Sequence, residues 1–325
     1  MSREQRRALD AKLRSFQPLF GTGSIQEARD GFAALMSTMQ VPDGIRTAEV
    51  DLAGIRTLRI EPAGRPRPGT ILFFHGGSFV VGSPQTQLGL TANLVVRTGY
   101  TAYSVDYRLA PEHPFPAGID DTTAAYRALL EAGHDPASIA FAGDSAGGGL
   151  TITTLLRARQ QGLPMPAAVV AFSPGLDNAG TGASYHTKAG IDPILSRESV
   201  QPNRDLYRAG ADPDQDLLSP ATHADPTGFP PLLLQVGTNE ILLDDSTRMA
   251  ERARDAGVDV ILDVTADVPH VFQTYAGVLD EADQALDRAA LFLTQHVAAP
   301  AAERGLEGPG GRSSGSVHAL MLSSG

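Results

Sequence analysis

The chain has 325 residues, a formal net charge of -11 and no cysteine, and 42% of its residues are hydrophobic. This length and apolar content suit a folded α/β protein with a sizeable core, built as one large domain or two ordinary ones. The acidic charge disfavours nucleic acid or an anionic membrane as the main partner, and the lack of cysteine excludes disulfides and thiolate metal sites.

The N-terminal region is predicted to be helical. Apolar residues recur at helical spacing through residues 2–39, with Leu9 and Leu13 on one stripe and Phe32 and Met36 on a second. The start of the chain is amphipathic and lacks the continuous apolar core of a signal peptide. No apolar stretch is long enough to span a bilayer. We therefore expect a cytoplasmic protein without a membrane span.

The next part of the chain predicts a sheet. Two short strands at 49–52 and 55–60 should pair around Ala53-Gly54. Strands and helices then alternate, with strands at 70–74, 101–105, 138–142 and 167–172 and helices at 86–98, 118–131 and 145–161. Nearly continuous apolar strands separated by helices predict a parallel sheet that is covered by helices on both faces.

A long insertion interrupts this alternation between residues 174 and 230, because the stretch is too long for an ordinary connection. Residues 199–208 within it carry a helical pattern, so we predict a small cap. Strands at 232–236 and 258–264 and helices at 244–256 and 277–296 then follow. The predicted organisation is a catalytic core at 46–174 and 226–298, N-terminal cap helices at 1–45, a cap insertion at 175–225 and a flexible tail at 299–325.

One serine stands in a setting typical of a catalytic nucleophile. The segment GDSAG at 143–147 follows an apolar strand and precedes a helical run. A sharp strand-to-helix turn exposes such a serine, and small flanking residues let neighbouring segments approach it. The segment GRSSG at 311–315 also fits the pattern, but it lies in the Gly/Ser-rich tail with no strand before it. The context favours Ser145.

The base and the acid have candidates in the expected chain order. A serine hydrolase needs a base for the hydroxyl proton and an acid to orient that base. His270 lies between the last strand and the last helix, whereas the other histidines lie where a structural or solvated role is expected. Glu240 follows strand 232–236 directly and is favoured as the acid. Asp244 remains an alternative, although Asp244 and Asp245 stand at a predicted helix start and are explained as N-terminal caps.

Backbone N–H groups should stabilise the oxyanion of the reaction. Gly76 and Gly77 follow strand 70–74, and Ala146 follows the predicted nucleophile, so the N–H groups of these three residues are the predicted donors. The sequence holds no HxH or HExxH pair, no GxGxxG after a strand and no GxxxxGK. We therefore predict neither a metal nor a cofactor.

Five segments in this order resemble the bacterial hormone-sensitive lipase family of esterases, within the α/β-hydrolase fold. They are HGGS at 75–78, DYRLAPEHPFPA at 106–117, GDSAGG at 143–148, EILLDD at 240–245 and PH at 269–270. The family usually has aspartate where Glu240 stands and a third glycine where Ser78 stands. A left-handed backbone at Ser78 would cost about 1 to 2 kcal/mol.

The resemblance implies a serine carboxylesterase that hydrolyses short- to medium-chain esters through an acyl-enzyme. Its expected partner is a small-molecule ester, and a homodimer through the sheet edge near 258–264 is also implied. A helical cap should cover the pocket, and the candidate lining residues are Phe32, Met36, Met39, Phe79, Tyr185 and Tyr207. The alternatives are a small-molecule receptor on a hydrolase fold, which typically lacks a triad member, or a hydrolase of lactones or amides.

Overall fold

The protein is described by a computed structural model covering residues 2–15 and 23–298. Eight strands form one sheet in the order β1-β2-β4-β3-β5-β6-β7-β8. The strands are β1 Ile45–Leu52, β2 Ile55–Pro62, β3 Thr70–Phe74, β4 Thr101–Val105, β5 Ile139–Asp144, β6 Ala168–Phe172, β7 Leu232–Gly237 and β8 Val260–Thr265. β2 pairs antiparallel with β1 and β4, and all other neighbours are parallel. The predicted fold class is confirmed.

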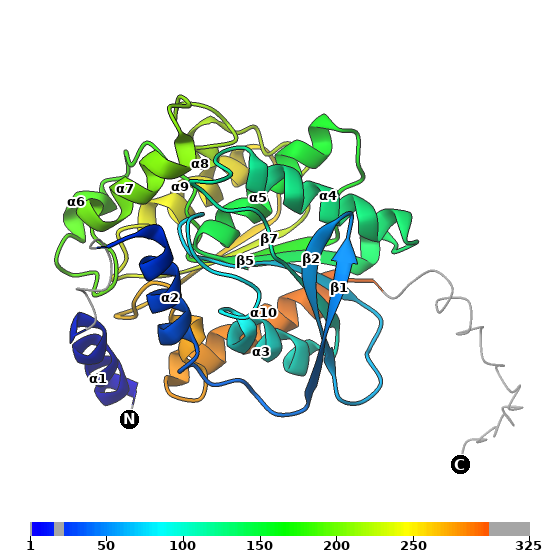
Figure 1. Cartoon of the computed structure of the whole chain (residues 1–325), viewed down its shortest axis with the longest axis horizontal. Coiled ribbons are helices and arrows are strands. Elements are labelled where there is room, and N and C mark those ends of the chain that lie inside the picture. The colour runs from blue at the N-terminus through cyan, green and yellow to red at the C-terminus, as the bar shows by residue number, and fades with distance from the viewer. Residues whose placement is uncertain (1, 16–22, 299–325) are drawn as a thin grey trace, which may run out of the picture.

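Helices cover both faces of the sheet (Figure 1). The helices α3 Leu88–Thr98 and α10 Asp280–His296 lie on one face, and α4 Ala117–Glu131, α5 Ala146–Gln160 and α9 Leu243–Asp255 lie on the other. The position of β3 between two layers of helices explains why its sequence is continuously apolar. Leu72 and Phe74 belong to the core under α4 and α5, whereas Ile71 and Phe73 belong to the core under α3 and α10. Alternate side chains point to opposite faces, and both faces are buried.

The N-terminal helices and the insertion gather at one end of the sheet (Figure 1). They comprise α1 Ser2–Ser15, α2 Ile25–Met36, α6 Ser184–Thr187, α7 Arg197–Arg208 and α8 Pro220–His223. Arg14 of α1 donates to the carbonyl oxygens of Gly190 and Ile191 in the insertion. Arg29 of α2 pairs with Glu112 on the core. These contacts fix both helices over the part of the core that carries the site.

Several sequence predictions can be compared directly with these elements. The hairpin around Ala53-Gly54 is confirmed, and both residues have positive φ, as a tight two-residue hairpin turn requires. Residues 2–39 hold α1 and α2, while 16–22 lie outside the described residues, as do the predicted tail at 299–325 and its GRSSG segment. The short helices α6 and α8 were not predicted. The boundaries of the predicted cap stay a prediction.

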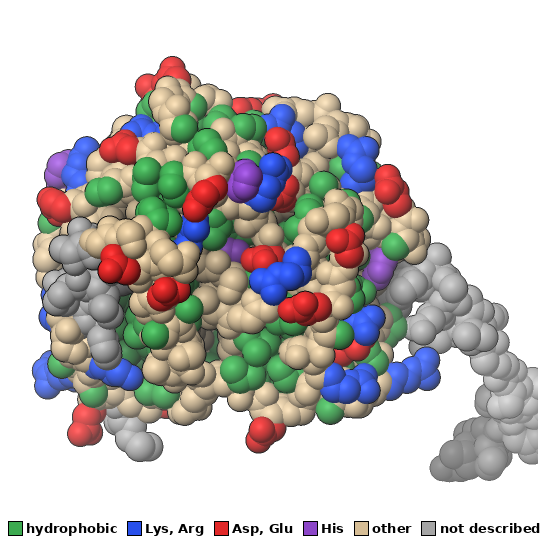
Figure 2. All heavy atoms as spheres, in the orientation of Figure 1, with side chains coloured by type: hydrophobic (Ala, Val, Ile, Leu, Met, Phe, Trp, Pro, Cys, Tyr) green, Lys and Arg blue, Asp and Glu red, His purple; other side chains and the backbone are tan. Residues whose placement is uncertain are grey.

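One face of the molecule shows a mixture of residue types. On the face in Figure 2, acidic and basic side chains stand among apolar ones over the whole view. Among the helices that the structure describes, none is both long enough and apolar enough to cross a membrane.

Candidate active site

Ser145 stands at the sharp turn from β5 into α5. Its φ of 53° and ψ of −118° are a strained conformation for serine, which persists only where the surroundings enforce it. The flanking glycines allow this turn to form. A Cβ on Gly147 would lie 2.0 Å from the carbonyl oxygen of Phe74, and one on Gly143 would lie 2.4 Å from the carbonyl oxygen of Gly147. Any side chain there would push the strands and α5 apart.

Three side chains from distant parts of the chain form a hydrogen-bonded series at this turn. Ser145 Oγ lies 2.8 Å from His270 Nε2, and His270 Nδ1 lies 2.8 Å from Glu240 Oε2. Glu240 follows β7 and His270 follows β8, so parallel strands deliver all three to the same edge of the sheet. The second oxygen of Glu240 accepts hydrogen bonds from the Ser173 hydroxyl, at 2.8 Å, and from the Gly237 N–H. The carboxylate is therefore fixed on both sides.

The two other carboxylates after β7 have different roles. Asp244 accepts a hydrogen bond from the Ser184 N–H at 2.9 Å, and Asp245 accepts one from the Leu176 N–H at 2.7 Å. Both lie in the first turn of α9, but they hold the segment that follows β6 instead of capping their own helix. The structure therefore brings Glu240, and not Asp244, to His270.

The buried carboxylates around His270 determine the direction in which its pKa is shifted. His270 is 7% exposed and Glu240 is fully buried. Burial alone would lower the pKa of His270, but the hydrogen bond and charge of Glu240, together with the charges of Asp192 and Asp144, outweigh it and raise that pKa. A raised pKa makes the neutral imidazole a stronger base.

The loop after β3 differs in one respect from the prediction. The N–H of Gly76, a predicted oxyanion donor, donates instead to Asp144 Oδ1 at 3.0 Å. Gly77 and Ser78 line the cavity above Ser145, and within residues 2–15 and 23–298 no hydrogen bond is assigned to their N–H groups. Ser78 has a φ of 54°, the left-handed conformation anticipated from the family's glycine. Ala146 is the first residue of α5, where an N–H has no partner within the helix.

Asp144 connects this loop to the nucleophile. Its Oδ2 accepts a hydrogen bond of 2.6 Å from the Gln87 side chain at the start of α3. Burial raises the pKa of Asp144 to about 7, against the opposing effect of its hydrogen bonds. The sequence placed Asp144 in the GDSAG segment but gave no signal for its two partners, because they come from other elements. Asp144, which directly precedes Ser145, therefore links the nucleophile turn to the β3 loop and to the start of α3.

We expect Asp144→Ala to lower kcat for a short ester by about 10- to 100-fold. The change leaves the Gly76 N–H and the Gln87 amide without an acceptor, which costs about 1 to 3 kcal/mol of stability for each group. It also releases the β3 loop, whose N–H groups are the expected oxyanion donors. Asp144→Asn should retain most of the activity. The asparagine oxygen can accept from the Gly76 N–H, and its NH₂ can donate to the Gln87 oxygen after the Gln87 amide group rotates by half a turn. Steady-state kinetics and thermal unfolding of both variants check this, and an equal loss in the two would contradict it.

A cavity of about 540 Å³ opens above the three residues. Ser145 and His270 lie in its wall, and Phe32 and Met36 of α2 are among its lining residues. The insertion contributes Ile194 and neighbouring residues. The sequence predicted a cap from this insertion but did not identify the residues that line the cavity, because nothing in its composition shows which side faces the core. Within the described residues, no group of three His, Asp or Glu side chains is arranged to hold a metal ion.

The remaining predicted lining residues lie elsewhere. Met39 lines a neighbouring cavity. Phe79 and Tyr207 stack on each other with ring centroids 3.8 Å apart in an apolar cluster that also holds Phe32, and neither ring lines the catalytic cavity. Tyr185 is 1% exposed and packs in another cluster under α7. Apolar size alone does not distinguish a pocket wall from a core, so the predicted lining role of these three aromatic residues is corrected.

A Ser–His–Glu series at the carboxyl edge of a mostly parallel sheet defines the class of α/β hydrolases. The model of a family described as having the α/β-hydrolase fold matches residues 71–274. An acetyl-hydrolase of Streptomyces hygroscopicus is 40% identical over 250 residues, covering 77% of this chain and 83% of the relative. An esterase of Acinetobacter venetianus is 38% identical over 251 residues, covering 77% and 82%.

Solved structures of esterases also match the chain. The crystal structure of an esterase from the bacterial hormone-sensitive lipase family matches with a TM-score of 0.87 and 38% identity, covering 91% of this chain and 99% of that one. The chain therefore belongs to the α/β-hydrolase family, and within it to the bacterial hormone-sensitive lipase group of carboxylic ester hydrolases.

Proposed function

We propose that the chain is a serine carboxylesterase in which Ser145 is the nucleophile, His270 the base and Glu240 the orienting acid. The observation that carries this proposal is the continuous series of two 2.8 Å hydrogen bonds from Glu240 through His270 to Ser145. The series ends in the wall of the 540 Å³ cavity, where an ester can reach the hydroxyl. A hydrolase-fold receptor typically lacks one member of this set, and here all three are in contact.

Acylation follows from these positions. Ser145 Oγ attacks the ester carbonyl carbon while His270 Nε2 takes the hydroxyl proton, and Glu240 stabilises the resulting imidazolium without taking that proton. The N–H groups of Gly77, Ser78 and Ala146 donate to the developing oxyanion, with Gly76 replaced by Ser78 in the set of donors. The tetrahedral intermediate collapses as the imidazolium gives its proton to the leaving alcohol.

Deacylation repeats these steps with water. His270 takes a proton from the water as its oxygen attacks the acyl carbon, and the same histidine then returns the proton to Ser145 Oγ. The products are the free carboxylic acid and the restored enzyme. The alcohol leaves on the side of His270, because Nε2 must reach its oxygen.

The proposed substrates are short- to medium-chain carboxylic esters. The catalytic cavity presents mainly apolar side chains from α2 and the insertion, which suits an alkyl group beside the reacting carbonyl. The Streptomyces relative is named an acetyl-hydrolase, and a short acyl group in this chain is in keeping with that name.

Covalent labelling tests the nucleophile. We expect a fluorophosphonate to inactivate the protein with one label per chain, located on Ser145 by peptide mass spectrometry. Heat-unfolded protein serves as the control, because an ordinary serine hydroxyl is a weak nucleophile without its base. A label found on Ser173 or Ser78 in the folded protein would reject the assignment.

The homodimer implied by the family resemblance stays a prediction, as does the cytoplasmic location. β8 is an edge strand, and Ile261 and Val264 on it are exposed. We propose this edge as the dimer contact, since an unpaired strand offers free backbone groups to a second copy. Sedimentation velocity checks it, and a monomer at micromolar concentration would contradict it.

A further inference from the structure

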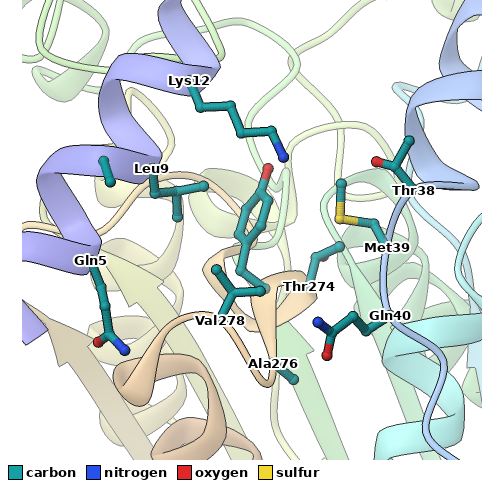
Figure 3. A pocket seen from close by; sticks show the side chains of 11 residues that line it. Gln5, Leu9, Lys12, Thr38, Met39, Gln40, Thr274, Ala276 and Val278 are labelled. Carbon is teal, nitrogen blue, oxygen red and sulfur yellow. The ribbon is translucent and has the colours of Figure 1, made fainter. Parts of the chain in front are cut away.

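A second cavity of about 430 Å³ lies beside the catalytic one. Leu9 and Lys12 of α1 project into it from one side and Met39, after α2, from the other, with Thr274 and Val278 between them (Figure 3). Its lining is mainly apolar carbon. The catalytic series does not reach it, and the proposed mechanism gives it no role.

The two cavities share one wall. Thr274 and Tyr275 line both of them, and both belong to the short helix η3 Phe272–Tyr275 that follows the catalytic histidine. On α1, Leu9 lines the second cavity and Leu13, one turn further on, lines the catalytic cavity. The cavities therefore follow the same side of α1 and are divided by the residues of η3.

The walls around this division are well anchored. Leu9 and Leu13 are buried against Val268 and Phe272, so α1 packs firmly on the core. The carbonyl oxygen of Tyr275 accepts hydrogen bonds of 3.0 Å from the N–H groups of two residues that follow it. By contrast, no hydrogen bond is assigned to the Tyr275 hydroxyl within the part of the chain that the structure describes. The Tyr275 side chain packs against the same apolar cluster as Leu9 and Leu13.

The direction of the leaving group decides which part of an ester meets this wall. His270 Nε2 must protonate the alcohol oxygen, so the alcohol lies on the histidine side of the reacting carbon. Tyr275 follows His270 closely in the chain and lines the same cavity. In the arrangement that we infer, the alcohol chain, and not the acyl chain, extends toward Tyr275 and the second cavity.

We propose that Tyr275 is the partition that limits the length of the alcohol chain, and that the second cavity can hold the far end of a longer unbranched alkyl alcohol. The proposal rests on the esterase function proposed above. The ligand class is an ester of a short acid with a medium- to long-chain primary alcohol. Tyr275 acts by shape, because removing the ring would join two apolar cavities into one longer site.

The test compares n-alkyl acetates of increasing alcohol length, with the released acid followed by titration at constant pH. We expect Tyr275→Ala to raise the ratio of kcat/KM for dodecyl acetate to that for butyl acetate at least tenfold, because each further buried methylene favours binding. Tyr275→Phe keeps the ring and should leave the ratio unchanged. Adding Met39→Trp to Tyr275→Ala should fill the second cavity and remove the gain.

Each outcome decides one point. An unchanged ratio in a folded Tyr275→Ala, judged by its thermal unfolding, overturns the partition, and Tyr275→Leu repeats the comparison if the alanine variant does not fold. A gain confined to p-nitrophenyl esters with long acyl chains overturns the assignment to the alcohol. If the unmodified protein hydrolyses neither butyl acetate nor p-nitrophenyl acetate, the esterase proposal itself fails.

Discussion

Ser145→Ala is expected to lower kcat for p-nitrophenyl butyrate by on the order of 10⁴- to 10⁶-fold, the largest effect of any single change in this chain. The substitution removes the only atom of the proposed series that bonds to the acyl carbon. It keeps Cβ, so the strained turn at a φ of 53° is unaltered and the fold should persist. Steady-state kinetics, circular dichroism and thermal unfolding measure activity and fold separately.

Ser173→Ala is the matched control for that variant. It also removes a buried hydroxyl at the site, but this hydroxyl donates to Glu240 and accepts from the Val271 N–H, and it does not touch His270. Its activity should fall by no more than about 10- to 100-fold, in line with the loss of one hydrogen bond to the charged Glu240 and one from the Val271 N–H. Undiminished turnover by Ser145→Ala would remove the serine mechanism altogether.

The sheet could be predicted closely because its strands are buried on both faces. The apolar runs at 70–74 and 101–105 have the predicted bounds in the structure. Such runs end where the polypeptide leaves the core, so composition alone marks their limits. The insertion carries no such signal. Its short helices α6 and α8 are held by contacts such as Ser184 with Asp244, which join distant parts of the chain.

The site was predictable to the level of residue type and chain order, and less so to the level of single hydrogen bonds. Fold topology requires the nucleophile, acid and base to follow parallel strands in that chain order, here β5, β7 and β8, which selected Ser145, Glu240 and His270. Topology does not say where one N–H group points. Gly76 was therefore predicted to be an oxyanion donor. In the structure its N–H, after the end of β3, donates to the Asp144 carboxylate at the end of β5.

Glu240→Gln is expected to lower kcat by on the order of 10³- to 10⁴-fold. Oε1 of Glu240 accepts from Ser173 and Gly237, so the glutamine oxygen should occupy that place and its NH₂ should face His270 Nδ1. The histidine would then carry its proton on Nε2 and could not act as the base. Asp244→Asn keeps an acceptor for the Ser184 N–H and should change kcat by less than about threefold.

The pH profiles of Glu240→Gln and Asp244→Asn distinguish the loss of the charge that orients His270 from a simple loss of packing. Activity needs neutral His270, so it falls as the pH drops through the pKa of that residue. Because the Glu240 carboxylate raises this pKa, the acid limb of kcat/KM in the unmodified protein should have its midpoint above about 6.5. Glu240→Gln removes the charge and should move the residual activity's acid limb to lower pH, while Asp244→Asn leaves it in place. A shift seen only in Asp244→Asn would transfer the role of the acid to Asp244.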